Sequence, residues 1–194
     1  MVAGLICKDS KIKIKSVLLN PTRDGIYKCL DEMGANIRYF NKKNEAGEIT
    51  YDIEVSSSSL NPIDVPANRA PSMIDDYPIL AIAASMAKGT SIFRGLSELK
   101  VKESDRLLGI YKILSKNGIH TSIEDDNLII NGNVEGPKGG ALIETNLDHR
   151  IAMSSIILGM VSDEPIKVDD TETIKTSFPD FIELMKKLGA KLTA

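Results

Sequence analysis

The spacing of hydrophobic positions changes several times along this chain, and each spacing predicts a different element. Basic and apolar residues alternate over residues 11–19, which is the period-two pattern of a half-buried strand. Over residues 22–33 the apolar positions recur every three or four residues, which predicts an amphipathic helix. Gly34 then suits a left-handed helix end, and residues 35–40 and 50–55 are expected to form two strands that pair.

This succession recurs along the chain. The junction of amphipathic helix, single glycine and strand occurs three times, at Gly34, Gly118 and Gly189. Two stretches between them, residues 72–87 and 146–161, are apolar on nearly every side, so we expect helices buried in the interior. Short strand patterns follow these helices at residues 90–94 and 165–168. The pattern predicts an α+β protein made of related β-α-β-α-β-β units, each about 70 to 80 residues long.

No segment of the chain has the composition of an interdomain linker. Residues 1–194 are therefore expected to form a single lobe, which is long enough to bury a sizeable core. The apolar run at residues 2–7 is interpreted as the end of a helix that begins outside this chain. The first unit is accordingly expected to lack its N-terminal part.

Composition and charge exclude several classes of function. A formal net charge of -3 is not that of a general nucleic-acid binder. Cys7 and Cys29 are isolated from each other and from histidines, so neither a disulfide framework nor a zinc site is expected. The longest apolar stretch, residues 78–87, is much shorter than the roughly 20 residues that span a bilayer. We therefore expect a cytoplasmic protein that binds neither nucleic acid nor membrane.

The densest charged motif covers residues 98–106. Lys102 and Arg106 are four residues apart and Glu103 and Arg106 three, so these side chains can meet on one turn of a helix. Taken alone, this motif is best interpreted as a solvated helix start with charge pairs.

A second motif covers residues 146–150. Asn146 or Asp148 can cap the following helix, which leaves His149 and Arg150 in its first turn. Cations oppose the helix dipole there unless a bound anion shares the site. An arginine that reaches a surface carboxylate explains Arg150 equally well.

Three other features have structural interpretations. Ser72 is predicted to be a helix N-cap with Asp75 at the third position of a capping box. Ser177 is predicted to be another N-cap, with Pro179 in the first turn. His120 falls in strand-like alternation and is expected to be packed rather than catalytic.

In order and spacing, these motifs together resemble those of the EPSP synthase family. The resemblance rests on Asp75 ahead of an alanine-rich helix and on residues 99–106, 148–153, 176–181, 19–23 and 30–34. It implies one lobe of the enolpyruvyl transferase fold, with pseudo-threefold βαβαββ units packed around buried helices. It also implies a complete enzyme with a second, N-terminal lobe that this chain lacks.

The activity implied by the resemblance is transfer of an enolpyruvyl group by addition and elimination. Phosphoenolpyruvate is the donor and the 5-hydroxyl of shikimate 3-phosphate the acceptor, in the shikimate pathway of aromatic amino acid biosynthesis. No metal or organic cofactor is implied. The resemblance matches Asp75 to the carboxylate that contacts the 5-hydroxyl, a general base, and Glu103 to the residue that protonates the methylene.

Further residues are matched to substrate binding by the same resemblance. Arg106 and Arg150 are similar to the arginines that bind phosphoenolpyruvate, with His149 beside them, and Lys102 lies next to both substrates. Two positions depart from the family pattern. Glu98 stands where some members have Asn, and Thr176 where some have Lys, with Lys175 one place earlier as a possible phosphate ligand.

Without the anion ligands of the other lobe, the isolated chain is predicted to be inactive or nearly so. Two alternatives stay open at this point. The chain could belong with the UDP-N-acetylglucosamine enolpyruvyl transferases, which share the lobe architecture, or it could be a non-catalytic, anion-binding module of the same fold.

Overall fold

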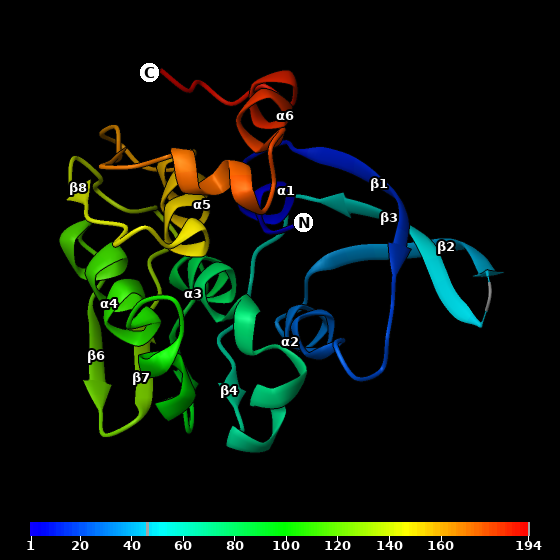
Figure 1. Ribbon diagram of the computed structural model, residues 1–194, viewed down its shortest axis with the longest axis horizontal. Coiled ribbons are helices and arrows are strands. Elements are labelled where there is room, and N and C mark those ends of the chain that lie inside the picture. The colour runs from blue at the N-terminus through cyan, green and yellow to red at the C-terminus, as the bar shows by residue number, and fades with distance from the viewer. Residues whose placement is uncertain (46, 194) are drawn as a thin grey trace.

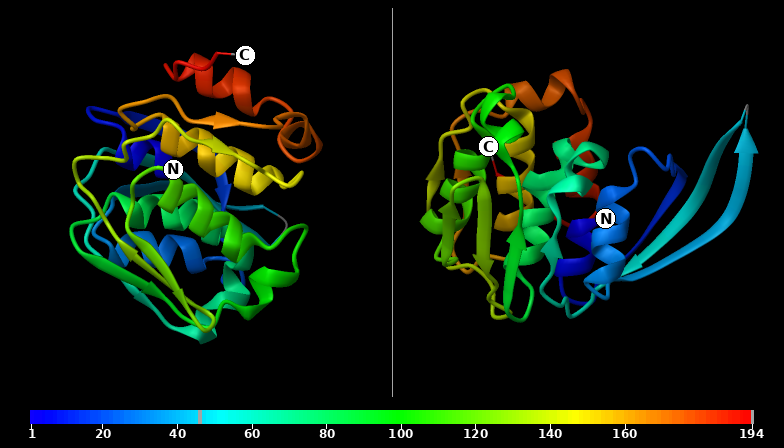
Figure 2. Two further views of the ribbon diagram at one scale, coloured as in Figure 1. Left: turned by 90° about the vertical axis from the view of Figure 1, so that its left-hand side faces the viewer. Right: turned by 90° about the horizontal axis from the view of Figure 1, so that it is seen from below.

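The computed structural model describes residues 1–45 and 47–193 (Figure 1). Its first segment contains α1 (Val2–Ile6), β1 (Lys11–Leu18), α2 (Gly25–Glu32), β2 (Asn36–Glu45) and β3 (Glu48–Ser56). The three strands form an antiparallel sheet in the order β1-β3-β2. The expected pairing of the strands around residues 35–40 and 50–55 is confirmed. Strands β2 and β3 extend away from the rest of the molecule (Figure 2).

The middle segment contains the complete predicted unit. In chain order its elements are β4 (Asp64–Val65), α3 (Tyr77–Ser85), β5 (Thr90–Phe93), α4 (Arg106–Lys116), β6 (Thr121–Glu124) and β7 (Asn127–Asn131). The sheet order is β4-β5-β7-β6, with β4 and β5 parallel and the other pairs antiparallel. The β-α-β-α-β-β succession is therefore present in residues 64–131. Three short 3-10 helices interrupt it: η1 (Ala67–Ser72), η2 (Ile74–Asp76) and η3 (Ser97–Val101).

The last segment repeats the first four elements of this unit, β-α-β-α. It contains β8 (Leu142–Ile143), α5 (His149–Gly159), β9 (Lys167–Val168), the 3-10 helix η4 (Glu172–Thr176) and α6 (Phe181–Lys187). Strands β8 and β9 pair in parallel, as β4 and β5 do. Gly34, Gly118 and Gly189 all have positive φ, which confirms the left-handed helix ends expected from the sequence.

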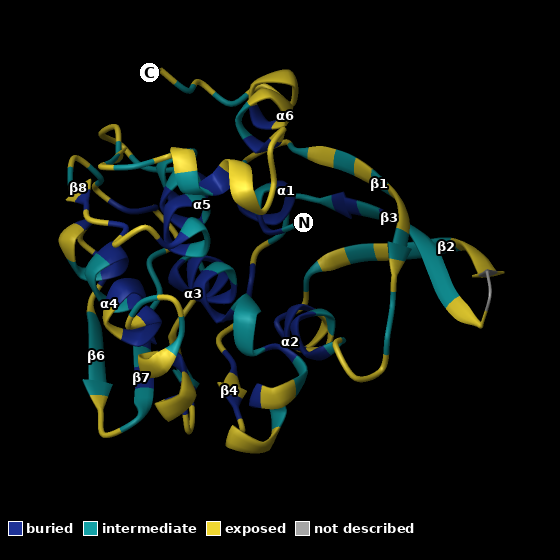
Figure 3. Cartoon of the chain, in the orientation of Figure 1, coloured by how far each residue is buried: buried dark blue, intermediate teal, exposed yellow. Residues whose placement is uncertain are grey.

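The interior is built around α3, which packs against both α1 and α5. Eight of the nine residues of α3 are buried, and the helix is dark blue along most of its length in Figure 3. A helix that is apolar all round must be covered on every side, so the repeats surround it. The two buried helices predicted from the sequence are confirmed as α3 and α5. The charged residues of the candidate site lie next to the first turns of these two helices.

Two predicted helix N-caps are wrong, and so is the predicted burial of His120. Ser72 does not cap α3: its hydroxyl donates to the carbonyl oxygen of Arg69 at 2.8 Å, and the helix begins only at Tyr77, with Pro78 in its first turn. Ser177 likewise follows η4 instead of capping α6, which begins at Phe181. Prolines at 71 and 179 lie in the segments just before these helices, where they favour a later helix start.

His120 is exposed, contrary to the prediction that it is packed. A ring nitrogen, Nδ1, lies 2.7 Å from the side-chain nitrogen of Asn131. The residue lies just before β6 and next to the buried Ile119, so the alternation places it on the exposed face. In the part of the chain that the structure describes, none of the helices is both long and apolar enough to cross a membrane.

Candidate functional site

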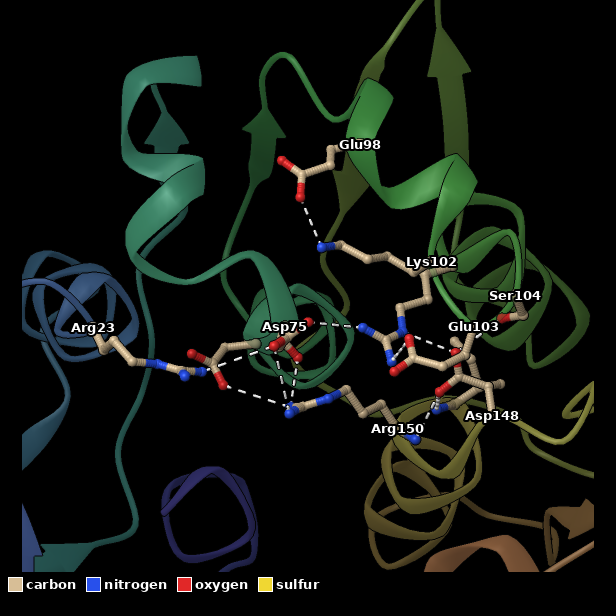
Figure 4. A network of polar contacts seen from close by, with 11 residues as sticks. Arg23, Asp75, Glu98, Lys102, Glu103, Ser104, Asp148 and Arg150 are labelled. Carbon is tan, nitrogen blue, oxygen red and sulfur yellow. Dashed lines mark hydrogen bonds and ion pairs between the residues drawn. The ribbon is translucent and has the colours of Figure 1, made fainter. Parts of the chain in front are cut away.

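Asp75 lies in η2, immediately before the buried helix α3, and three arginines converge on its side chain (Figure 4). Arg106 Nη1 lies 2.9 Å from Asp75 Oδ1. Arg150 Nη2 and Arg23 Nη2 each lie 3.8 Å from Asp75 Oδ2. The arginines come from the start of α4, the start of α5 and the loop after β1. The carboxylate of Asp75 is thus the point where the three repeated segments meet.

Arg106 is completely buried, with 0% of its side chain exposed. Its Nε donates to Asp148 Oδ2 at 2.8 Å, and Asp148 is also fully buried. The solvated interpretation of the motif at residues 98–106 is therefore wrong for Arg106. α4 begins at Arg106 itself, capped by Asp105, whose carboxylate accepts from the backbone N–H of Leu108 at 2.9 Å. Apart from the buried Leu99, residues 98–105 are exposed or half-buried.

Asp148 performs two structural roles. It is the N-cap of α5, as the sequence allowed, and its Oδ1 accepts from the backbone N–H groups of Arg150 and Ile151 at 2.9 and 3.4 Å. Its Oδ2 accepts from Arg106 and from the hydroxyl of Ser104 at 3.0 Å. Burial by itself would raise the pKa of Asp148, but the hydrogen bond and charge of Arg106, helped by those of Arg150 N–H and Ser104, outweigh it and lower the pKa.

Two more acidic residues contact the cationic groups from the solvent side. Lys102 Nζ lies 2.7 Å from Glu98 Oε1, and Arg106 Nη2 contacts the carboxylate of Glu103. The Glu103 carboxylate is 57% exposed, whereas Arg106 Nη2 is buried and makes no well-aligned hydrogen bond to the described residues. The predicted pairing of Glu103 with Arg106 is confirmed, while Lys102 pairs with Glu98 and lies outside α4.

Arg150 connects Asp75 to its neighbour Asp76. Its Nη1 donates to the backbone oxygen of Asp75 at 2.9 Å and lies 3.9 Å from Asp76 Oδ1. Burial raises the pKa of Asp76, and the charge of Asp75 adds to this, against the opposing charges of Arg150 and Arg23. His149 is half-buried beside Arg150 in the first turn of α5. Asp76 and Asp148 thus have contrasting environments, with the pKa of Asp76 raised and that of Asp148 lowered.

The structure does not bring Lys175 and Thr176 to this cluster through any contact among the described residues. Lys175 Nζ binds both oxygens of Glu172 within η4, at 2.7 and 2.8 Å, and its side chain is 64% exposed. The Thr176 hydroxyl donates to the backbone oxygen of Thr173 at 2.7 Å. η4 packs against α5, the helix that carries Arg150. Contacts join Asp75, Glu103, Arg106 and Arg150 to one another, whereas Glu98 and Lys102 form a separate pair.

Arg23, Asp76, Ser104 and Asp148 also belong to this network but were not predicted to be site residues. Arg23, Ser104 and Asp148 lie in stretches that carried the family resemblance, and Asp148 was also expected as a helix cap. A pocket of about 370 Å³ adjoins the network. It is lined by Leu18, Asn20, Arg23, Ile26, Tyr27 and Asp76.

Comparison with known proteins was made for the sequence and for the fold. A family profile described as EPSP synthase (3-phosphoshikimate 1-carboxyvinyltransferase) matches residues 1–185. Among curated relatives, the 3-phosphoshikimate 1-carboxyvinyltransferase of Paramagnetospirillum magneticum is 51% identical over 193 residues, and that of a Chelativorans species 50%. The matches cover 100% and 99% of this chain but 43% of each relative, so the chain spans less than half the length of these proteins.

Solved structures resemble the chain over nearly all its length. The EPSP synthase of Acinetobacter baumannii superimposes with a TM-score of 0.93 at 36% identity, covering 97% of this chain and 44% of that protein. The enolpyruvyl transferase NikO of Streptomyces tendae superimposes with a TM-score of 0.73 at 18% identity, covering 98% and 41%. The second likeness concerns the fold alone, and it agrees with the fold that the sequence predicted.

Proposed function

We propose that this chain, which belongs to the EPSP synthase family, supplies one wall of an enolpyruvyl transferase site. Residues 1–194 form one lobe of the enzyme, and a second lobe supplies the facing wall. The substrates are phosphoenolpyruvate and shikimate 3-phosphate. The names of the curated relatives favour this acceptor over UDP-N-acetylglucosamine.

The observation that carries the proposal is the convergence of Arg23, Arg106 and Arg150 on Asp75. Both proposed substrates are polyanions, and guanidinium groups bind carboxylate and phosphate oxygens with charge-assisted hydrogen bonds. The positive charge also offsets the carboxylate of Asp75, so that it can sit beside an anionic substrate. A surface ion pair would not need three arginines from three repeats.

The reaction assigns opposite tasks to two carboxyl groups. Asp75 takes the proton of the attacking 5-hydroxyl as a C–O bond forms to C2 of phosphoenolpyruvate, and Glu103 gives a proton to the methylene carbon. In the elimination the Glu103 carboxylate takes back a methyl proton as the bond from C2 to the phosphate oxygen breaks, which restores the double bond. Asp75 returns its proton to the departing phosphate. Lys102 and Arg150 are placed to bind substrate oxygens beside these groups. Glu98 pairs with Lys102 at 2.7 Å.

His149, Lys175 and Thr176 are proposed as outer substrate contacts. His149 follows Asp148 in the first turn of α5 and is adjacent to Arg150. Lys175 and Thr176 lie on η4, which packs against the same helix. The side chains of Lys175 and Thr176 bind Glu172 and the backbone oxygen of Thr173 within η4. Lys175 therefore has to leave Glu172 before its ammonium group can bind phosphate.

A chimera tests this proposal. Residues 1–193 replace the matching 43% of the Paramagnetospirillum magneticum relative, and phosphate release is measured with phosphoenolpyruvate and either acceptor. We expect turnover with shikimate 3-phosphate and none with UDP-N-acetylglucosamine. The isolated chain is expected to release phosphate barely or not at all, because one wall cannot exclude water or hold both anions. A folded chimera without turnover would favour the non-catalytic, anion-binding module.

A further inference from the structure

Arg23 is held beside the site by a turn that its own loop builds. The side-chain oxygen of Asn20 accepts from the backbone N–H and the hydroxyl of Thr22, at 2.9 and 2.7 Å. The backbone N–H of Arg23 then donates to the backbone oxygen of Asn20 at 2.8 Å. These three bonds set the direction in which the Arg23 side chain leaves the backbone. It approaches Asp75 from the side opposite to Glu103 and Asp148 (Figure 4).

The donors of the three arginines are used unequally. Arg106 is buried and binds Asp75 and Asp148 with well-formed hydrogen bonds. Arg150 donates to the backbone oxygen of Asp75. Arg23 makes no side-chain hydrogen bond to any described residue, only the 3.8 Å ion pair with Asp75, and its side chain is 69% exposed. All five N–H donors of its guanidinium are therefore available to a ligand.

The space that these donors can reach is the pocket of about 370 Å³ between the loop after β1 and η2. Tyr27 lines it as well, and the Tyr27 hydroxyl makes no hydrogen bond to the described residues, so it provides one more donor. Asp76 is the acidic residue of this pocket and repels an anion. The carboxylate of Asp76 and the guanidinium of Arg23 therefore have opposite effects on anion binding, and the two effects can be measured separately.

We propose that Arg23 is an anion-binding residue, and that the pocket beside it takes a carboxylate or phosphate group of the ligand. The identity of that ligand rests on the proposed function, whereas the assignment of Arg23 as an anion-binding residue does not. The proposal extends the candidate site to the first repeated segment, through Arg23. Arg106 is fully buried and binds Asp75 and Asp148, whereas the side chain of Arg23 is exposed and contacts the ligand.

Titration of the 194-residue chain with three small anions tests this. Inorganic phosphate, pyruvate and phosphoenolpyruvate are added separately, and the Nε–Hε resonances of the arginines are followed by NMR. We expect the Arg23 resonance to shift on saturation, and Arg23→Gln to weaken binding of phosphoenolpyruvate about tenfold, the effect of one lost charge-assisted hydrogen bond. Arg23→Lys should restore part of the affinity. Pyruvate and phosphate distinguish a carboxylate subsite from a phosphate subsite.

Two matched variants complete the test. Asp76→Asn removes the repelling charge and should tighten binding a few-fold, roughly the effect of one nearby charge in a partly exposed site. Arg94→Gln removes an arginine that forms an exposed pair with Asp64, and should leave binding unchanged. The proposal fails if Arg23→Gln binds within about twofold of the wild type, if the Arg23 resonance does not move while that of Arg150 does, or if none of the anions binds. The titration measures binding and the chimera measures turnover. Failure of the Arg23 proposal can therefore be distinguished from failure of the proposed function.

Discussion

The guanidinium of Arg106 and the carboxylate of Asp148 form a pair in which neither side chain is exposed, with Arg106 Nε 2.8 Å from Asp148 Oδ2. The two residues begin neighbouring helices, α4 and α5. Because Asp148 also caps α5 and Arg106 also binds Asp75, this one contact ties together the three helix starts on which the candidate site is built.

Breaking this pair should be costly for folding. Asp148→Ala leaves a buried arginine without its partner and α5 without its cap, and we expect a loss of about 3–5 kcal/mol in the free energy of unfolding. Asp105→Ala is the matched control, because Asp105 caps α4 from an exposed position, and should cost about 1 kcal/mol. Urea unfolding measures both, with Asp148→Asn as the milder replacement. Equal losses for the two alanine variants would contradict the role assigned to the pair.

Removing the negative charge of Asp76 should have the opposite effect on stability to removing that of Asp148. Since burial raises the pKa of Asp76 in the folded chain, its protonated form favours folding, and this contribution is lost as pH rises through the folded pKa. Asp76→Asn imitates the protonated form. We expect the variant to unfold at higher urea concentration than the wild type at pH 7, with the difference vanishing below about pH 4, the ordinary pKa of an Asp. A variant that is less stable at pH 7 would show that attraction by Arg23 and Arg150 exceeds the effect of burial.

Gly132 should tolerate no side chain. A Cβ there would lie 2.2 Å from the backbone oxygen of Ala87 and 2.7 Å from that of Ala84, at the end of α3. Backbone cannot yield as a side chain can, so Gly132→Ala is expected to cost roughly 2–3 kcal/mol. In Gly109→Ala the new methyl meets only the flexible end of Ile151, at 2.8 Å, and the gain in helix propensity of up to about 1 kcal/mol offsets the contact. Thermal unfolding of both variants checks this order.

The two proposed catalytic carboxyl groups can be tested in the chimera. Asp75→Asn and Glu103→Gln should each lower kcat by about a hundredfold to ten-thousandfold, the usual effect of losing a general base or acid. Asp64→Asn alters an exposed acidic residue that pairs with Arg94, and should leave kcat unchanged. Full kcat in Glu103→Gln would remove Glu103 from proton transfer, and the carboxyl groups would have to be reassigned.

Local spacing predicted the type and order of the main helices and strands, but not where α3 and α6 begin. Alternation over residues 11–19 predicted β1 within one residue, and apolar residues on every side predicted that α3 and α5 are buried. Glycines with positive φ were found at all three predicted helix ends, because few other residues adopt that conformation cheaply. The order of the charged motifs was sufficient for the family, which the matching profile confirms.

Tertiary structure alone decided which charges far apart in the sequence meet. Arg106 lies in a run of charged residues, and local spacing offered it only neighbours within one turn. Its buried partner Asp148 is 42 residues away, and Asp75 is 31 residues away in the other direction. Arg23 reaches Asp75 only because α2, α3 and α5 bring three repeats to one place. Burial and long-range ion pairs depend on the packing of whole helices, which no window of sequence contains, whereas the period of an element is set by its own backbone.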